Sequence, residues 1–151
     1  MKKVFVLILL TLIYGCGYSS VYKDQNEVDL FINVVNSNGD FELNNFIRNE
    51  LKIASKKNST KKYNISYETK YEKIILAKDA TGTATDYRLD MNVKFQIISK
   101  NFNEINFSDN FKIKNTSENF EQSNYERDIK RNFSKAAKDE LIRRLIEIND
   151  N

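Results

Sequence analysis

The chain has 151 residues, of which 24 are basic and 21 acidic, and it contains one cysteine, no histidine and no proline. This near balance of charge argues against a nucleic-acid-binding protein, because such proteins carry a clear excess of Lys and Arg. The lack of histidine, of a glycine-rich phosphate loop and of a metal-ligand cluster argues against an enzyme and predicts no cofactor.

The N-terminal residues have the pattern of a bacterial signal peptide. Lys2 and Lys3 form a short basic region, and residues 4–13 form an apolar run interrupted only by Thr11. This run is too short to cross a bilayer core, which takes about 20 apolar residues. We therefore expect residues 1–15 to be removed, the alternative being an uncleaved apolar helix.

Cys16 is the predicted first residue of the mature protein. The Gly15-Cys16 junction resembles the lipobox of bacterial lipoproteins, which implies an S-diacylglycerol and an N-acyl group on Cys16. A lone cysteine suits this role, because a secreted chain with one thiol cannot form an internal disulfide. Several acyl chains anchor a protein to a membrane far more firmly than one. The residue after Cys16 is Gly17 and not aspartate, and an aspartate at this position resembles an inner-membrane retention signal. We therefore expect the protein at the outer membrane, facing the periplasm.

Cleavage would leave a lipidated tether, residues 16–27, and one domain, residues 28–151, which is large enough to bury a single core. Residues 28–35 predict a buried strand, which the turn residues at 37–40 should end. Apolar residues then recur at helical spacing over residues 40–55 and predict an amphipathic helix.

The next predicted elements are a loop and a hairpin. Residues 56–62 are basic and polar, which favours a solvated connection. Residues 63–71 and 83–97 each alternate between apolar and polar positions, as in strands with one wet face, and the turn residues at 79–82 join them. On the second strand we expect one core-facing set: Tyr87, Leu89, Met91, Val93 and Phe95. Arg88, Asp90 and Lys94 should face water.

A fourth strand is predicted over residues 105–113, and the four-residue spacing from Phe107 to Phe111 indicates a bulge near Asp109. From about Asn124 an amphipathic helix should follow. Its expected apolar face consists of Tyr125, Ile129, Phe133, Ala136, Ala137, Leu141, Leu145 and Ile148.

Together these elements predict an α+β fold. Each strand and each helix has one apolar side, and two stacked layers bury all of these sides together. We expect a two-layer sandwich in the order β-α-β-β-β-α, with a four-stranded, mostly antiparallel sheet and two helices on one face.

Several segments resemble the LptE family of lipopolysaccharide-assembly lipoproteins, and the resemblance covers nearly the whole chain. The segments are Gly15-Cys16-Gly17-Tyr18 with Val21-Tyr22, Gly82-Thr83-Ala84-Thr85-Asp86-Tyr87-Arg88-Leu89, Ala136-Ala137, and Leu141-Ile142-Arg143-Arg144-Leu145. The resemblance implies a protein without enzymatic activity that sits inside the outer-membrane β-barrel LptD. There it would assist barrel assembly, plug the lumen and interact with lipopolysaccharide.

Lipopolysaccharide carries phosphates and sugars, for which Arg and Lys are natural partners. The candidate residues are Arg88, Lys94, Arg143 and Arg144. The alternative for Arg88 and Lys94 is that they are solvated charges paired with Asp86, Asp90 or other neighbours. The alternative for Arg143 and Arg144 is that they are solvated cations near the C-terminus of a helix, where the helix dipole favours positive charge. Asp86 and Asp90 share one strand face and could in principle do acid-base work, although a surface ion pair with Arg88 is the simpler interpretation.

Partner contact is the expected mode of action. The turn at residues 79–82 and the loop at residues 56–62 are the expected inserted tips, because loops at the ends of a sandwich reach furthest. The competing interpretation is a different periplasm-facing lipoprotein, such as a cell-wall-binding or secretion-pilotin module.

Overall fold

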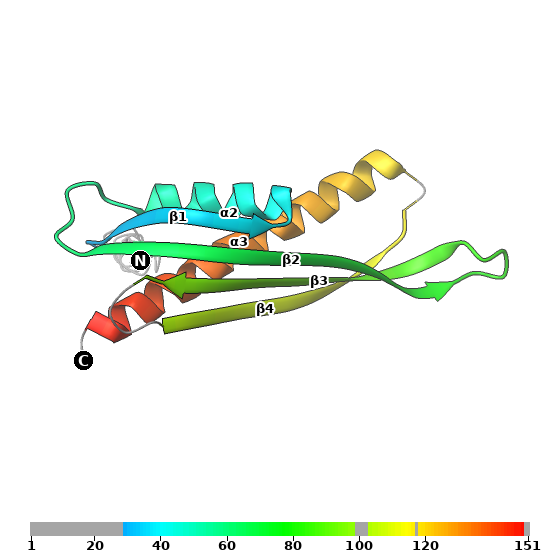
Figure 1. Ribbon diagram of the computed structural model, residues 1–151. Coiled ribbons are helices and arrows are strands. Elements are labelled where there is room, and N and C mark those ends of the chain that lie inside the picture. Colours follow the sequence, from blue (N-terminus) through cyan, green and yellow to red (C-terminus); the bar gives the residue numbers. More distant parts are fainter. Residues whose placement is uncertain (1–28, 99–102, 117, 150–151) are drawn as a thin grey trace, which may run out of the picture.

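The computed structural model describes residues 29–98, 103–116 and 118–149. The predicted signal peptide, the lipidation site and the tether lie outside these residues. The order of elements matches the prediction (Figure 1) and runs β1 (Phe31–Gly39), α2 (Phe41–Ala54), β2 (Lys62–Lys78), β3 (Ala84–Ile97), β4 (Asn103–Lys114) and α3 (Asn119–Asn149).

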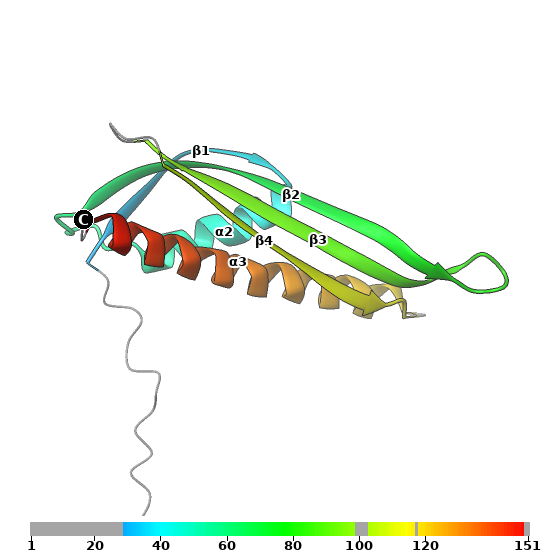
Figure 2. The ribbon, with the colours of Figure 1, turned by 90° about the horizontal axis from the view of Figure 1, so that it is seen from below.

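The four strands form one sheet in the order β1-β2-β3-β4. β1 runs parallel to β2, with α2 as the crossover between them, and the other two pairs are antiparallel. Both helices lie on the same face of the sheet, as Figure 2 shows, and α2 also packs against α3. This confirms the predicted α+β sandwich with a mostly antiparallel sheet.

The facing of β3 follows the predicted alternation. Leu89, Met91, Val93 and Phe95 are buried, and Tyr87 is partly buried and packs against the same core. The intervening residues, including Arg88, Asp90 and Lys94, lie on the opposite face of the sheet. The odd-numbered positions therefore face the helices, where apolar burial stabilises the sandwich.

β1 continues further than predicted. The turn residues at 37–40 were expected to end the strand, but Asn38 and Gly39 pair with Glu68 and Thr69 of β2. Parallel pairing with β2 overrides the preference of these residues for turns. The longer strand therefore depends on a neighbouring strand, which local propensity does not capture.

Gly39 makes the sharp entry into α2 possible. Its φ of +104° is left-handed, and a Cβ there would lie 1.9 Å from the Thr69 carbonyl oxygen, so only glycine fits. The next residue, Asp40, caps the helix, because its Oδ1 accepts a hydrogen bond of 2.8 Å from the Leu43 amide.

The prediction of a bulge near Asp109 is wrong. β3 and β4 pair without a register shift, and Asp109 lies opposite Met91. A spacing of four keeps Phe107 and Phe111 on the same face of a strand of period two, so no extra residue is needed. Register shifts occur instead in β1, between Val34 and Asn36, and near the tip of β2.

α3 begins five residues earlier than predicted, at Asn119, and its buried stripe is narrower. The buried members are Ile129, Phe133, Ala137, Leu141 and Leu145. Tyr125, Ala136 and Ile148 were expected in this stripe but are exposed. At the N-terminal end of α3 the inward positions are instead polar, with Gln122 buried and Glu126 half-buried. The spacing of apolar residues alone therefore predicted the wrong inward face of the helix there.

The β2-β3 hairpin extends beyond both helices (Figures 1 and 2). β2 has 17 residues, which corresponds to about 55 Å of extended strand. α2, with 14 residues, covers only about 21 Å. The turn at residues 79–82 therefore lies at one end of the molecule, and the loop at residues 56–62 lies at the other.

Candidate functional site

The outer face of the sheet carries two of the four cations predicted to bind lipopolysaccharide. Arg88 makes two hydrogen bonds to Asp90, from Nε to Oδ1 at 2.8 Å and from Nη2 to Oδ2 at 3.0 Å. Lys94 Nζ lies 2.7 Å from Glu104 Oε2, and this hydrogen bond lowers the pKa of the Glu104 carboxyl. Each cation is thus paired with a carboxylate on the same face.

An open hollow of about 440 Å³ lies on this face across β2, β3 and β4. Arg88 and Lys70 supply its positive charge, and its lining also holds three carboxylates and three neutral polar side chains: Glu72, Asp90, Asp109, Asn92, Ser108 and Asn110. Lys70 was not among the predicted residues, and it forms no ion pair with any residue in the described part of the chain. The amide, hydroxyl and cationic groups of this lining can bind sugar hydroxyls and phosphates, and a phosphate would have to displace a carboxylate from Arg88. Lys94 lies outside this hollow.

The other two predicted cations belong to the helix layer. Arg143 and Arg144 lie on α3, and both bind Glu140, with Nη2 of Arg143 at 2.6 Å and Nε of Arg144 at 3.0 Å from Oε1. Arg144 Nη1 also lies 3.2 Å from Glu147 Oε2. The hydrogen bond from Arg143 lowers the pKa of the Glu140 carboxyl.

The structure therefore divides the four predicted residues between opposite layers of the sandwich and does not bring them into one site. Arg88 faces away from the helices, whereas Arg143 lines a groove between α3 and β4 of about 550 Å³, together with Phe107 and Ile146. The carboxylate partners of the two helix arginines were missed, although their spacing of three or four residues was a usable signal.

A second polar cluster, which the sequence did not reveal, ties the two helices to β2. The Lys130 side chain is 9% exposed, and its Nζ lies 2.9 Å from Glu42 Oε2 and 3.9 Å from the centre of the Tyr71 ring. The Tyr71 hydroxyl donates to Glu126 Oε2 at 3.1 Å, and burial raises the pKa of Tyr71. This cluster lies inside the sandwich, where the buried charge of Lys130 must be paired to be stable. We therefore interpret the cluster as structural.

The hairpin tip is held by one carboxylate. Asp79 Oδ1 accepts hydrogen bonds from the amides of Thr81 and Thr83, at 2.8 and 3.0 Å, and from the Thr81 hydroxyl. These hydrogen bonds lower the pKa of Asp79. Gly82, with φ of +88°, supplies the left-handed position of the turn. Close to this ordered tip, Ile75 is 50% exposed and Leu76 43% exposed.

Two further findings concern the described residues only. Residues 29–98, 103–116 and 118–149 contain no group of three or more His, Cys, Asp or Glu side chains placed to hold a metal ion. No helix in those ranges combines the length and the apolar composition that crossing a membrane requires.

Comparison with known families decides the assignment. Residues 28–147 match the LptE family, described as lipopolysaccharide-assembly. The chain belongs to the LptE family. The match spans every strand and helix of the sandwich except the last residues of α3. The LptE family is a family of non-enzymatic assembly proteins. Of the two carboxylates on the outer face of β3, Asp90 pairs with Arg88, and Asp86 accepts a hydrogen bond from the Thr85 hydroxyl.

Solved structures share the fold. Rare lipoprotein B from Shewanella oneidensis has 14% sequence identity and a TM-score of 0.55, over 79% of this chain and 98% of that one. A protein from Caulobacter crescentus described as a lipoprotein has 13% identity and a TM-score of 0.51, over 76% of this chain and 86% of that one. No curated protein sequence matches the chain. At these identities the similarity establishes the LptE-like fold alone.

Proposed function

We propose that this LptE-family chain is a lipoprotein acylated at Cys16 and held at the outer membrane, facing the periplasm. There it pairs with a β-barrel of the LptD type, assists barrel assembly and plugs the lumen during transport of lipopolysaccharide to the cell surface. Family membership over residues 28–147 is the observation that carries this proposal. The Gly15-Cys16 junction behind a short apolar run supports the acyl anchor.

The surface chemistry of the sheet supports a role inside a barrel. Its outer face carries polar or charged side chains along β3: Arg88, Asp90, Asn92, Lys94 and Gln96. The lumen of a large outer-membrane barrel is polar and wet, so a polar face can lie against it without burying unpaired apolar surface. A domain of this kind acts by contact and needs no catalytic group.

The hairpin is the best candidate for the inserted element. It projects past the helices, and its tip is preorganised by the Asp79 hydrogen bonds, so little conformational entropy is lost when a partner binds it. Ile75 and Leu76 near the tip are about half exposed and offer apolar surface to a partner. A partner that surrounds the tip would remove this apolar surface from water.

Lipopolysaccharide is the proposed ligand of the outer face. Arg88 and Lys70 at the hollow are the central groups, and a phosphate can compete with Asp90 for the planar guanidinium of Arg88. Lys94, Arg143 and Arg144 remain further candidates. Because the helix arginines lie in the other layer, they would meet a different part of the ligand or of the barrel.

Affinity purification tests the partner. A tagged mature chain, extracted from membranes in mild detergent, should return with a large outer-membrane barrel protein, and depletion of the chain should reduce assembled barrel and surface lipopolysaccharide. The Cys16→Ala variant is the control, because it keeps the domain but removes the anchor. Recovery of the chain alone, with barrel assembly and surface lipopolysaccharide unchanged on depletion, would favour another periplasmic binding or pilotin module.

Direct binding tests the ligand. Arg88→Ala should weaken binding of purified lipopolysaccharide about tenfold or more, since a hydrogen bond to a charged group contributes about 1.5–3 kcal/mol. Lys112→Ala is the matched control, because Lys112 is exposed on β4 directly opposite Arg88 in the register but does not line the hollow. Equal affinities of the two variants would reject the assignment of Arg88.

A further inference from the structure

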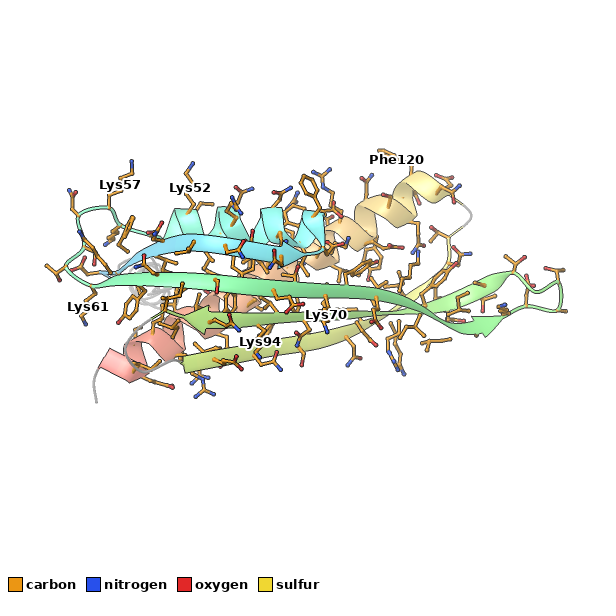
Figure 3. The ribbon with its side chains drawn as sticks, in the orientation of Figure 1. Lys52, Lys57, Lys61, Lys70, Lys94 and Phe120 are labelled. Atoms are coloured by element: carbon orange, nitrogen blue, oxygen red, sulfur yellow. The ribbon has the colours of Figure 1, made fainter. Side chains whose placement is uncertain are left out.

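The end of the molecule opposite the hairpin carries a concentration of positive charge, which we call the lysine end. Its members are Lys52, Lys56, Lys57, Lys61 and Lys62. All five are exposed, and none forms an ion pair with another residue of the described chain. Figure 3 shows Lys52, Lys57 and Lys61 projecting from this end. The whole chain is nearly neutral, so this local excess is not a consequence of composition.

An apolar side chain is exposed among these lysines. Ile53, in the last turn of α2, is 76% exposed and follows Lys52 directly. Lys56 and Lys57 come three and four residues later, just beyond the helix end. Basic residues around an exposed apolar side chain are typical of surfaces that rest on a membrane, where cations meet phosphates and the apolar group enters the interface.

The chain enters its fold beside the lysine end. The Phe31 amide donates to the Lys61 carbonyl at 2.7 Å, and the Lys56 amide donates to the Leu30 carbonyl at 2.9 Å. Cys16 precedes Asp29 by 13 residues, so an anchor there lies at most about 45 Å from this entry point. The hairpin tip lies about 55 Å further along β2. An acyl anchor therefore holds the lysine end, and not the hairpin, closest to the membrane.

We propose that the lysine end docks on anionic phospholipid headgroups of the leaflet that holds the acyl anchor. The proposal rests on the acylation of Cys16 in the proposed function. Each lysine near an anionic membrane surface strengthens binding about fivefold, and Ile53 adds apolar contact at the interface. Docking of this end leaves the hairpin, at the far end, free for the barrel. The loop at residues 56–62 is then a membrane contact and not a second inserted tip.

Fluorescence quenching in vesicles measures this docking. In the acylated protein Cys16 carries the lipid, so a cysteine introduced at Asn58 or at Thr81 is the only free thiol and accepts a fluorophore specifically. Both positions are exposed, the first in the lysine loop and the second at the hairpin tip. The labelled protein is reconstituted into phosphatidylcholine vesicles that contain a nitroxide on the lipid headgroup, with and without phosphatidylglycerol.

We expect strong quenching at position 58 that increases with phosphatidylglycerol and falls as salt rises, and little quenching at position 81. Loss of three lysines should weaken docking on the order of 100-fold. The triple variant Lys52→Glu, Lys57→Glu and Lys61→Glu reverses these charges, so it should weaken docking by at least this factor and abolish the dependence on phosphatidylglycerol.

The matched control makes the same change in charge on the sheet, away from the lysine end. It carries Lys78→Glu, Lys112→Glu and Lys114→Glu, all at exposed positions. It should retain the quenching at position 58.

Equal quenching at the two labels, no response to phosphatidylglycerol, or an equal loss in the control variant would overturn the proposal. Flotation with phosphatidylcholine vesicles separates this result from failure of the anchor. A chain that floats but shows no quenching at position 58 refutes the docking alone. A chain that does not float refutes the acyl anchor and the docking together.

Discussion

The register of β3 can be tested by two substitutions at adjacent positions. Phe95 is fully buried, and its ring meets Tyr67 edge to face, with centroids 5.8 Å apart at an angle of 60°. Phe95→Ala removes this contact and leaves a cavity, which costs about 3–5 kcal/mol of the free energy of unfolding. Lys94→Ala, one residue away, removes only a half-exposed ion pair with Glu104 and should cost less than about 1 kcal/mol.

Urea and thermal unfolding of the mature domain measure both changes. Each kcal/mol shifts the midpoint temperature by about 3–5 °C in a domain of this size, so Phe95→Ala should lower it by about 10–20 °C. The lysine variant should stay within about 4 °C of the unsubstituted protein. A larger loss for Lys94→Ala than for Phe95→Ala would mean that β3 faces the other way.

Three further predictions concern the turn, the polar cluster and the anchor. Gly39→Ala should destabilise the domain by more than about 2 kcal/mol, measured by urea unfolding, because the added Cβ meets the Thr69 carbonyl at a left-handed φ. Burial alone would raise the pKa of Glu126, but hydrogen bonds from Lys73 and Gln122 outweigh it and lower the pKa below 4.5. The stabilisation from this carboxylate is therefore complete above pH 4.5 and lost as pH falls through the lowered pKa. Stability should decline more steeply at acid pH than in Glu126→Gln, and parallel pH profiles would contradict this. Cys16→Ala should leave the domain folded but move it from the membrane to the soluble fraction, whereas an intact N-terminal peptide starting at Met1 in membrane protein would exclude cleavage before Cys16.

The strands were the most predictable part of the fold. β2 and β3 each bury one face, so apolar residues at every second position report both the element and its orientation. β1 was less predictable because its last residues, Asn38 and Gly39, are held by pairing with β2. The prediction of the inward face of α3 was wrong at its N-terminal end for a related reason, since the contact of Glu126 with Tyr71 of β2 turns a polar side of the helix inward there.

The candidate site was predicted only in part. The ion pair of Arg88 with Asp90 was predicted, because the two residues face the same way on one strand. The ion pairs of Arg143 were not predicted, although the helical spacing of its partners indicates them. Lys130 and Glu42 are 88 residues apart in the sequence, so only the packing of α2 against α3 brings them together. The hollow around Lys70 likewise depends on three adjacent strands, which a single strand pattern cannot reveal.

The most direct test of the proposed function is site-specific photo-crosslinking from the hairpin tip in intact cells. A photo-reactive amino acid at Thr81 should crosslink to a large outer-membrane barrel protein of the LptD type. The tip extends past both helices, so a barrel that surrounds the domain would contact it. The same group at Lys114, exposed on the edge of the sheet, gives a comparison for the rest of the surface. A barrel adduct from Thr81 is the predicted result. Adducts only with other periplasmic proteins, or none with a barrel from either position, would contradict the proposed function.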